Sequence, residues 1–246
     1  MIAPEVFTFS SATRLAHAAA EVVVETLRAA LAVRGRAALV LTGGSTPGPL
    51  YRHLAADYRS ALDWERVDVF FGDERYVPHD DEDSNFLMAR DTLLDGLPLS
   101  PDRIHPIPTG ASPEADAHAY EETLRAYFGD GPPAFDLLLL GMGADGHVAS
   151  LFPGSPALDE RDRWVVATKS PPTSPIRDRI TLTFPAINAA RTVLFLVAGA
   201  SKHDAFAAVH GDPGDAPPAE RVEPRDRLLW FVDEDAAGAW TNLRTS

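Results

Sequence analysis

Four groups of glycine and polar residues stand directly after apolar segments of the sequence, and each could bind or act on a small anion. They are Gly43-Gly44-Ser45-Thr46, Asp73-Glu74-Arg75, Asp145-Gly146-His147 and the single residue Lys202. A glycine-rich turn that leads into a helix presents backbone N–H groups to a phosphate. Arginine and lysine add positive charge, and a histidine, whose ordinary pKa is about 6.5, can serve as a general base. This combination predicts a site for a small molecule that carries a phosphate.

Each group also has a simpler structural interpretation when it is taken alone. Gly43-Gly44 fits a tight turn between a strand and a helix, and Arg75 fits a surface ion pair with Asp73 or Glu74. His147 fits a structural histidine that only holds a loop together. The shared position of the groups favours a functional site, because the carboxyl ends of parallel strands meet at one edge of a sheet.

The elements that must position these groups follow from the hydrophobic pattern and from turn residues. The repeated strand–turn–helix order predicts a single α/β domain over residues 1–246. Its core is expected to be an open, mostly parallel, Rossmann-like sheet with helices on both faces. Strands are predicted at 37–41, 67–71, 135–140, 164–168, 180–183, 193–197 and 228–232, and helices at 11–33, 50–58, 85–94, 113–128 and 202–209.

The composition excludes several classes of protein. Among 246 residues, 22 Lys and Arg stand against 36 Asp and Glu, and the formal net charge of −14 repels the phosphate backbone of nucleic acids. The chain has no cysteine, so disulfides, thiolate metal sites and a cysteine nucleophile are excluded. The most apolar stretches, near 137–142 and 192–200, fall well short of the roughly 20 residues that span a bilayer. We therefore expect a cytoplasmic protein that binds neither nucleic acid nor membrane.

Several other motifs do not withstand a check of their surroundings. Residues 141–146 match the dinucleotide fingerprint G-x-G-x-x-G, but Pro153 and Pro156 interrupt the helix that should follow, and the next predicted strand ends in Lys169 instead of an acidic residue. No Lys-Ser/Thr pair follows the glycines of the first group, as a Walker A loop requires. The acidic run 80–83 lacks the ligand spacing of an EF-hand, and no zinc-ligand pair or G-x-S-x-G motif is present.

Taken together and in order, seven segments resemble the 6-phosphogluconolactonase family. Glucosamine-6-phosphate deaminases have a similar fold and a similar Asp-Gly-His segment, but they place a carboxylate before the proline that follows. Here that stretch is Val148-Ala149-Ser150-Leu151-Phe152-Pro153, without such a carboxylate, so the lactonase is favoured. The resemblance covers nearly the whole chain and rests on residues 41–47, 72–78, 83–85, 141–153, 179–183, 199–202 and 230–234.

The resemblance implies hydrolysis of 6-phospho-D-glucono-1,5-lactone to 6-phosphogluconate, a step of the oxidative pentose phosphate pathway. It implies that His147 is the general base, that Asp145 orients it, and that Arg75 stabilises the oxyanion or holds the polar edge of the substrate. Substrate and phosphate would be bound by Gly43, Gly44, Ser45, Thr46, Asn85, Arg179 and Lys202.

No metal or organic cofactor is expected, because a lactone is already activated, and the expected partner is the small-molecule substrate alone. A glucosamine-6-phosphate deaminase or isomerase and a non-catalytic sugar-phosphate sensor remain as alternatives. The oligomeric state is left open.

Overall fold

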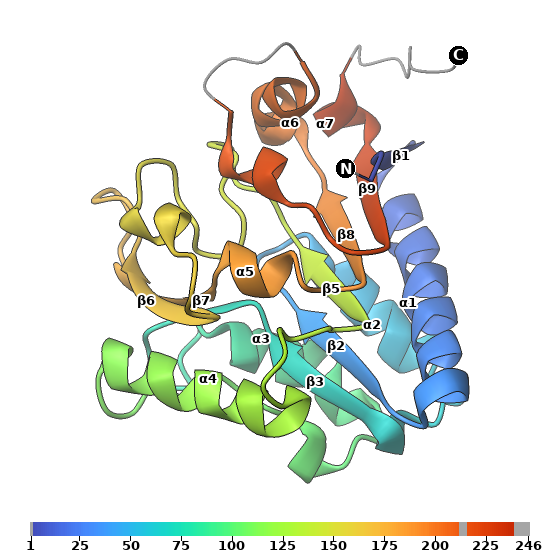
Figure 1. Ribbon diagram of the computed structural model, residues 1–246. Helices are drawn as coiled ribbons and strands as arrows, with labels where there is room; N and C mark the ends of the chain where they lie inside the picture. Colours follow the sequence, from blue (N-terminus) through green and yellow to red (C-terminus); the bar gives the residue numbers. More distant parts are fainter. Residues whose placement is uncertain (1, 212–215, 239–246) are drawn as a thin grey trace.

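Short, continuously apolar segments form a buried parallel sheet in the computed structural model, which describes residues 2–211 and 216–238 (Figure 1). All neighbouring strands of this main sheet run parallel, as the sequence predicted. Within the described residues its six strands lie in the order β1 (Glu5–Phe9), β9 (Arg227–Asp233), β8 (Thr192–Val197), β5 (Leu137–Leu140), β2 (Ala37–Leu41) and β3 (Val67–Phe71).

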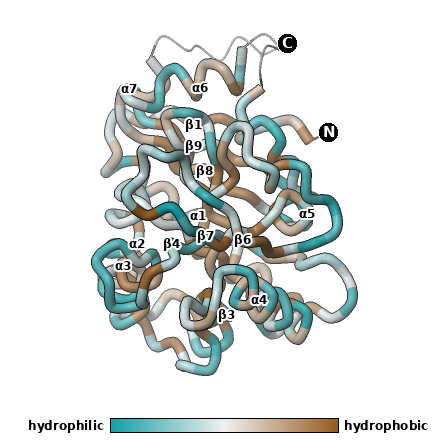
Figure 2. The backbone as a smooth tube through the Cα atoms, turned by 90° about the vertical axis from the view of Figure 1, so that its left-hand side faces the viewer, coloured by the Kyte–Doolittle hydropathy of each residue, from teal (hydrophilic) through white to brown (hydrophobic). Residues whose placement is uncertain are grey.

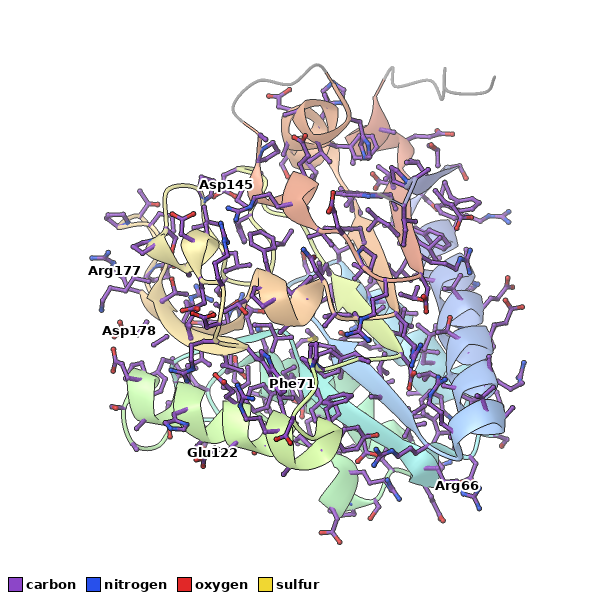
Figure 3. All side chains as sticks on the ribbon, in the orientation of Figure 1. Arg66, Phe71, Glu122, Asp145, Arg177 and Asp178 are labelled. Carbon is purple, nitrogen blue, oxygen red and sulfur yellow. The ribbon has the colours of Figure 1, made fainter. Side chains whose placement is uncertain are left out.

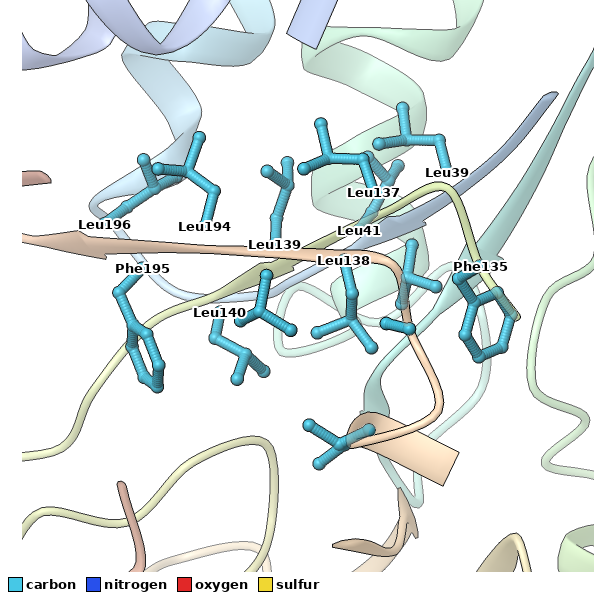
Figure 4. Close-up of a cluster of buried hydrophobic side chains, with 14 of the residues drawn as sticks. Leu39, Leu41, Phe135, Leu137, Leu138, Leu139, Leu140, Leu194, Phe195 and Leu196 are labelled. Carbon is cyan, nitrogen blue, oxygen red and sulfur yellow. The ribbon is translucent and has the colours of Figure 1, made fainter. Parts of the chain in front are cut away.

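The centre of the main sheet is buried on both faces. Successive side chains of a strand point to opposite faces, so Leu137 and Leu139 of β5 project to one side and Leu138 and Leu140 to the other (Figure 4). Helices α1 and α2 lie against one face, and the short helix α5 lies against the other (Figure 1). Continuous apolar runs are typical of strands covered in this way, as in β2 (AALVL) and β5 (LLLL).

A second, smaller sheet lies beside the main one, and it was not foreseen. The segments predicted as strands at 164–168 and 180–183 were assigned to the parallel sheet, and this is wrong. They pair antiparallel with each other and with a strand that contains Arg75, which was expected in a loop. Figure 2 shows the three strands side by side. Their order is β4 (Asp73–Arg75), β7 (Asp178–Leu182) and β6 (Val165–Lys169).

Gly72 joins the two sheets. It stands between β3 and β4, and its N–H donates to the carbonyl of Leu41 in the main sheet at 2.9 Å. Its own carbonyl accepts the N–H of Leu182 in the small sheet at 2.8 Å. One residue therefore belongs to the hydrogen-bond ladders of both sheets and fixes their separation.

The helices begin and end close to the predicted positions. Ser11 caps α1 by accepting the N–H of Arg14 at 3.3 Å, and Gly35 ends it in the left-handed region with φ of 71°. The sequence predicts that Pro47 or Pro49 opens the helix that contains residues 50–58, because proline suits a first turn, and α2 begins at Pro47. No helix of the described residues is long and apolar enough to cross a membrane. The helices are α1 (Ala12–Arg34), α2 (Pro47–Asp57), α3 (Asn85–Thr92), α4 (Pro113–Phe128), α5 (Phe184–Ile187), α6 (His203–His210) and α7 (Glu234–Ala237).

Helix α4 is fastened to the small sheet by a buried carboxylate. Glu121 is 4% exposed and accepts hydrogen bonds from Arg125 of its own helix, at 2.7 Å, and from Arg163, next to β6, at 2.6 Å. Burial alone would raise the pKa of Glu121, but the hydrogen bonds and charges of the two arginines hold that pKa below its usual range. The carboxylate form therefore stabilises the contact between α4 and the small sheet.

Glu121→Gln is expected to lower the free energy of unfolding by about 1–3 kcal/mol at pH 7, because a neutral amide loses the charge-assisted hydrogen bonds. The folded-state pKa of Glu121 lies below its unfolded value, so the contribution is complete above about pH 4.3 and is lost as the pH falls further. Urea unfolding at several pH values would show the gap between wild type and variant narrowing below that value.

Glu122→Gln is the matched control, because the neighbouring Glu122 side chain is exposed and projects into solvent (Figure 3). It should change the free energy of unfolding by no more than about 0.5 kcal/mol. An equal loss in both variants would contradict the role assigned to Glu121.

Candidate active site

The four groups singled out in the sequence meet in one cleft of about 550 Å³ at the carboxyl ends of the parallel strands. The main sheet supplies one wall through the loops after β2, β5 and β8, and the small sheet supplies the facing wall through β4 and β7. All ten residues predicted for the site line this cleft: Gly43, Gly44, Ser45, Thr46, Arg75, Asn85, Asp145, His147, Arg179 and Lys202.

His147 and Asp145 form a close pair in the loop after β5, which lies above the small sheet in Figure 3. The ring Nδ1 of His147 lies 2.6 Å from Oδ1 of Asp145, and the same oxygen accepts the backbone N–H of His147 at 3.2 Å. Partial burial by itself raises the pKa of the Asp145 carboxyl, but the hydrogen bonds and charge of His147 hold that pKa below its usual range. An ionised carboxylate only accepts hydrogen bonds, so Nδ1 carries the proton and Nε2 is left as the basic nitrogen.

Two neighbours fix the position of this pair. At Gly143 a Cβ atom would lie 2.1 Å from Nδ1 of His147 and 2.4 Å from Oδ1 of Asp145, so a residue with a side chain cannot stand there without moving the pair. On the other side, the ring of Phe152 packs against the His147 ring at 4.5 Å between centroids. Gly143, the second glycine of the G-x-G-x-x-G match, is therefore needed to leave space for His147.

Strand alternation explains how β4 serves both the cleft and the fold. Asp73 and Arg75 are two residues apart, so they share a face, and both line the cleft. Glu74 points the other way, is 1% exposed, and accepts the backbone N–H groups of Asn85 at 2.7 Å and Phe86 at 2.8 Å. Burial raises the pKa of Glu74, and these N–H donors oppose the rise. Glu74 thereby anchors the first turn of α3 beside β4.

Asn85 is held at the boundary between the two walls. Its Nδ2 donates to the carbonyl of Asp73 at 2.9 Å, whereas its buried Oδ1 has no hydrogen-bond partner among the described residues. A Cβ atom at Gly43 would lie 1.9 Å from that oxygen, so the first glycine of the turn is needed to admit the amide. The close approach of Gly43 and Asn85 brings the turn after β2 against the start of α3.

The cleft contains three cationic side chains on its two walls. Arg75 and Arg179 are direct partners in the register of β4 and β7, and Lys202 ends a short 3-10 turn after β8. Arg75 donates to the carbonyl of Asp83 at 2.6 Å, and Arg179 donates to Ser174 at 3.3 Å. Burial lowers the pKa of Arg179, an effect that the negative charge of Asp73 opposes. Nε of Arg179 is buried without a partner among the described residues.

The structure also corrects and extends the sequence interpretation of this region. The suggested ion pair of Arg75 with Asp73 or Glu74 does not form within the described residues. Asp73 instead accepts a hydrogen bond from Ser150 at 2.6 Å, and both residues line the cleft. The sequence analysis assigned neither residue a role in the site. Asp73 belongs to the same group as Arg75 and Ser150 to the segment 141–153, so both motifs were recognised, but nothing in them marked these two side chains as lining the cleft.

The described residues contain no group of three or more His, Asp or Glu side chains that could hold a metal ion. The side chains that line the cleft provide a basic imidazole, a carboxylate that orients it, and cations for an anionic ligand. Such an arrangement fits proton transfer to and from a small phosphorylated substrate.

The parallel sheet with a polar cleft at the carboxyl ends of its strands defines an open α/β protein with a candidate active site at that edge. The family described as "Glucosamine-6-phosphate isomerases/6-phosphogluconolactonase" matches residues 10–230, and the chain belongs to that family.

Similar proteins cover the chain almost completely. A relative from Synechocystis sp. named 6-phosphogluconolactonase is 43% identical over 249 residues, which cover 99% of this chain and 100% of the relative. One of the same name from Mycobacterium tuberculosis is 44% identical over 238 residues, covering 93% and 95% of the two chains. The solved structure of 6-phosphogluconolactonase from Trypanosoma cruzi superposes with a TM-score of 0.89 at 32% identity, covering 97% of both chains.

Gly143→Ala is expected to break the hydrogen bond between His147 and Asp145, because its Cβ would overlap both side chains. Long-range ¹H–¹⁵N NMR of the His147 ring reports which nitrogen carries the proton. In wild type we expect the Nδ1–H tautomer to outnumber the Nε2–H tautomer by about tenfold or more, because a charge-assisted hydrogen bond to Asp145 favours it by that factor. In the variant this preference should be lost.

Gly141→Ala is the matched control on the same loop, because a Cβ atom at Gly141 would meet nothing within 4 Å. Its His147 ring should keep the wild-type proton distribution. Unchanged ring shifts in Gly143→Ala, or equal changes in both variants, would show that the glycine does not set the geometry of the pair.

Proposed function

We propose that this chain is a 6-phosphogluconolactonase, which hydrolyses 6-phospho-D-glucono-1,5-lactone to 6-phosphogluconate. The observation that carries the proposal is the basic Nε2 of His147, created by the 2.6 Å contact of Nδ1 with Asp145, inside a cleft lined by three cations. The relatives named 6-phosphogluconolactonase, at 43–44% identity over nearly the whole chain, support the same activity.

In the proposed mechanism, Nε2 of His147 takes a proton from a water molecule while the water oxygen bonds to C1 of the lactone. The carbonyl oxygen becomes an oxyanion, and the guanidinium of Arg75 stabilises it. The oxyanion then collapses, the bond between C1 and the ring oxygen breaks, and His147 returns the proton to that oxygen. Asp145 stays ionised throughout and stabilises the imidazolium that forms in between.

The phosphate of the substrate is proposed to lie between the turn after β2 and the cations of the cleft. Gly43, Gly44, Ser45 and Thr46 precede α2, so their N–H and hydroxyl groups suit an anion at the start of that helix. Arg179 and Lys202 add charge-assisted contacts, and Asn85 completes the substrate-binding set. The proposed reaction needs no metal or organic cofactor.

Phe152 favours the lactonase over a deaminase. It stands directly before Pro153, the position at which the deaminases place a carboxylate, and its ring covers one side of His147 at 4.5 Å. An apolar ring there supplies no acid–base group for opening an amino sugar.

We propose that residues 1–246 form one functional domain, because both sheets contribute residues to the same cleft. A cytoplasmic location, expected from a cysteine-free acidic chain, belongs to the same proposal.

The direct test supplies freshly prepared phosphogluconolactone and glucosamine 6-phosphate in separate assays. We expect acid release from the lactone and no ammonia from the amino sugar. His147→Asn should lower kcat on the lactone by about 10²–10⁴-fold while product binding is retained, because the general base is removed.

The lactone also hydrolyses without enzyme, and faster in base. The rate measured without enzyme under the same conditions is therefore subtracted from each rate measured with enzyme. His118→Asn is the matched control, because His118 is an exposed histidine on α4, and it should leave kcat unchanged. Ammonia release would support the deaminase instead. A His147→Asn enzyme that keeps a third or more of wild-type kcat would show that another group is the base.

Arg179→Ala and Lys202→Ala should each lower kcat/KM for the phosphorylated lactone by roughly ten- to a hundredfold, mainly through KM. Unphosphorylated gluconolactone should be affected far less, because it lacks the anion that the two cations bind. Steady-state kinetics on both lactones measures the difference. Arg177→Ala, which removes an exposed arginine that projects outward from the small sheet (Figure 3), is the control. Equal losses on both lactones would reject the phosphate-binding role.

A further inference from the structure

Asp73 is a buried carboxylate in the wall of the cleft that forms no salt bridge among the described residues, although its charge acts on Arg179 in the same cleft. Its side chain lines the cleft and the residue is only 8% exposed. Oδ2 accepts a hydrogen bond from the hydroxyl of Ser150 at 2.6 Å, and Oδ1 accepts one from Nδ2 of Asn85 at 3.3 Å. Both donors are neutral. Among the described residues no Lys, Arg or His nitrogen forms an ion pair with it within 4 Å. Buried carboxylates are usually paired, so this negative charge calls for a functional explanation.

The position of Asp73 relative to the proposed base follows from the chain between them. Ser150, which donates to Asp73, is three residues after His147, and three residues span at most about 10 Å. The segment is shorter than that, because Val148 and Leu151 pair with each other in a tight turn. Asp73, on the small-sheet wall, is therefore held against the loop of the opposite wall that carries the proposed base His147.

The proposed reaction changes the charge at C1, the carbon that the activated water attacks. Water adds to C1, the bond from C1 to the ring oxygen breaks, and the ring oxygen gains a proton. The resulting carboxylic acid ionises and releases one proton to solvent. C1 is thus part of a neutral ester in the substrate and of a carboxylate in the product, while the phosphate at the other end keeps its charge.

We propose that Asp73 is a specificity-determining residue that weakens binding of the product by repelling its newly formed carboxylate. The inference rests on the proposed function and assigns Asp73 no role in the bond-breaking steps. Two carboxylates about 6 Å apart in a partly desolvated cleft repel strongly enough to reduce affinity by roughly ten- to a hundredfold. The neutral lactone end is not repelled, so the cleft distinguishes substrate from product even though both carry the same phosphate.

The test compares two open-chain ligands that differ only at C1. 6-Phosphogluconate carries a carboxylate there, and glucitol 6-phosphate carries a neutral CH₂OH group. Calorimetric titration at pH 7.5 gives the affinity of each protein for both ligands. In Asp73→Asn the ratio of the affinity for 6-phosphogluconate to the affinity for glucitol 6-phosphate should be at least about tenfold higher than in wild type. Ser150→Ala is the matched control, because it removes a hydrogen bond to Asp73 and keeps its charge, and its affinity ratio should equal that of wild type.

An unchanged ratio in Asp73→Asn, or an equal change in Ser150→Ala, would overturn the inference, since charge would then not be the cause. Wild type supplies a second measurement that does not depend on the folding of a variant. It should bind 6-phosphogluconate no more tightly than glucitol 6-phosphate, although the cleft holds three cations, and tighter binding would overturn the inference. Failure of wild type to hydrolyse phosphogluconolactone would instead refute the proposed function, so the two failures are distinguishable.

Discussion

The geometry of the cleft depends on the two backbone hydrogen bonds of Gly72. Its N–H bonds to the main sheet and its carbonyl to the small sheet, so the two walls are joined through a single residue. His147 is carried by one wall and both arginines by the other. These hydrogen bonds continue the β2–β3 ladder and the β4–β7 ladder at their ends, so the walls cannot separate at this point without breaking paired backbone groups. The backbone therefore holds the two walls of the cleft together at Gly72.

Within that frame, close approach of backbone to side chain sets the finer positions. Gly43 leaves space for the amide of Asn85, and Gly143 leaves space for the pair of His147 and Asp145. Glu74 contributes nothing to the cleft surface but holds the start of α3 beside β4 through backbone N–H groups. The polar side chains of the site are thus positioned in two ways. Glycines leave space where a larger side chain would overlap them, and a buried carboxylate accepts hydrogen bonds from the backbone beside them.

The sequence predicted much of this because the decisive signals were local. Strands 37–41 and 67–71 match β2 and β3, since buried parallel strands are continuously apolar, and Ser11 marked the start of the first helix. β1 was missed because this edge strand is largely exposed and lacks a clear apolar run.

The small sheet could not be predicted from local sequence patterns, because it depends on pairing between segments that are distant in the sequence. β4 is three polar residues long, and only pairing with β7, more than 100 residues away, makes it a strand. A loop gives no rule for the direction of its side chains, whereas a strand alternates them. The sequence therefore placed Arg75 in the site and missed that Asp73 shares its face.

The pairing of β4 with β7 also has a thermodynamic consequence. Arg75 and Arg179 stand directly opposite each other, and like charges in that relation cost folding free energy. An anion bound between the two arginines would offset this repulsion, so part of its binding energy would come from removing a cost that the folded chain carries. The free energy of unfolding would then rise with the concentration of that anion, so that the stability of the fold and the occupancy of the cleft would change together.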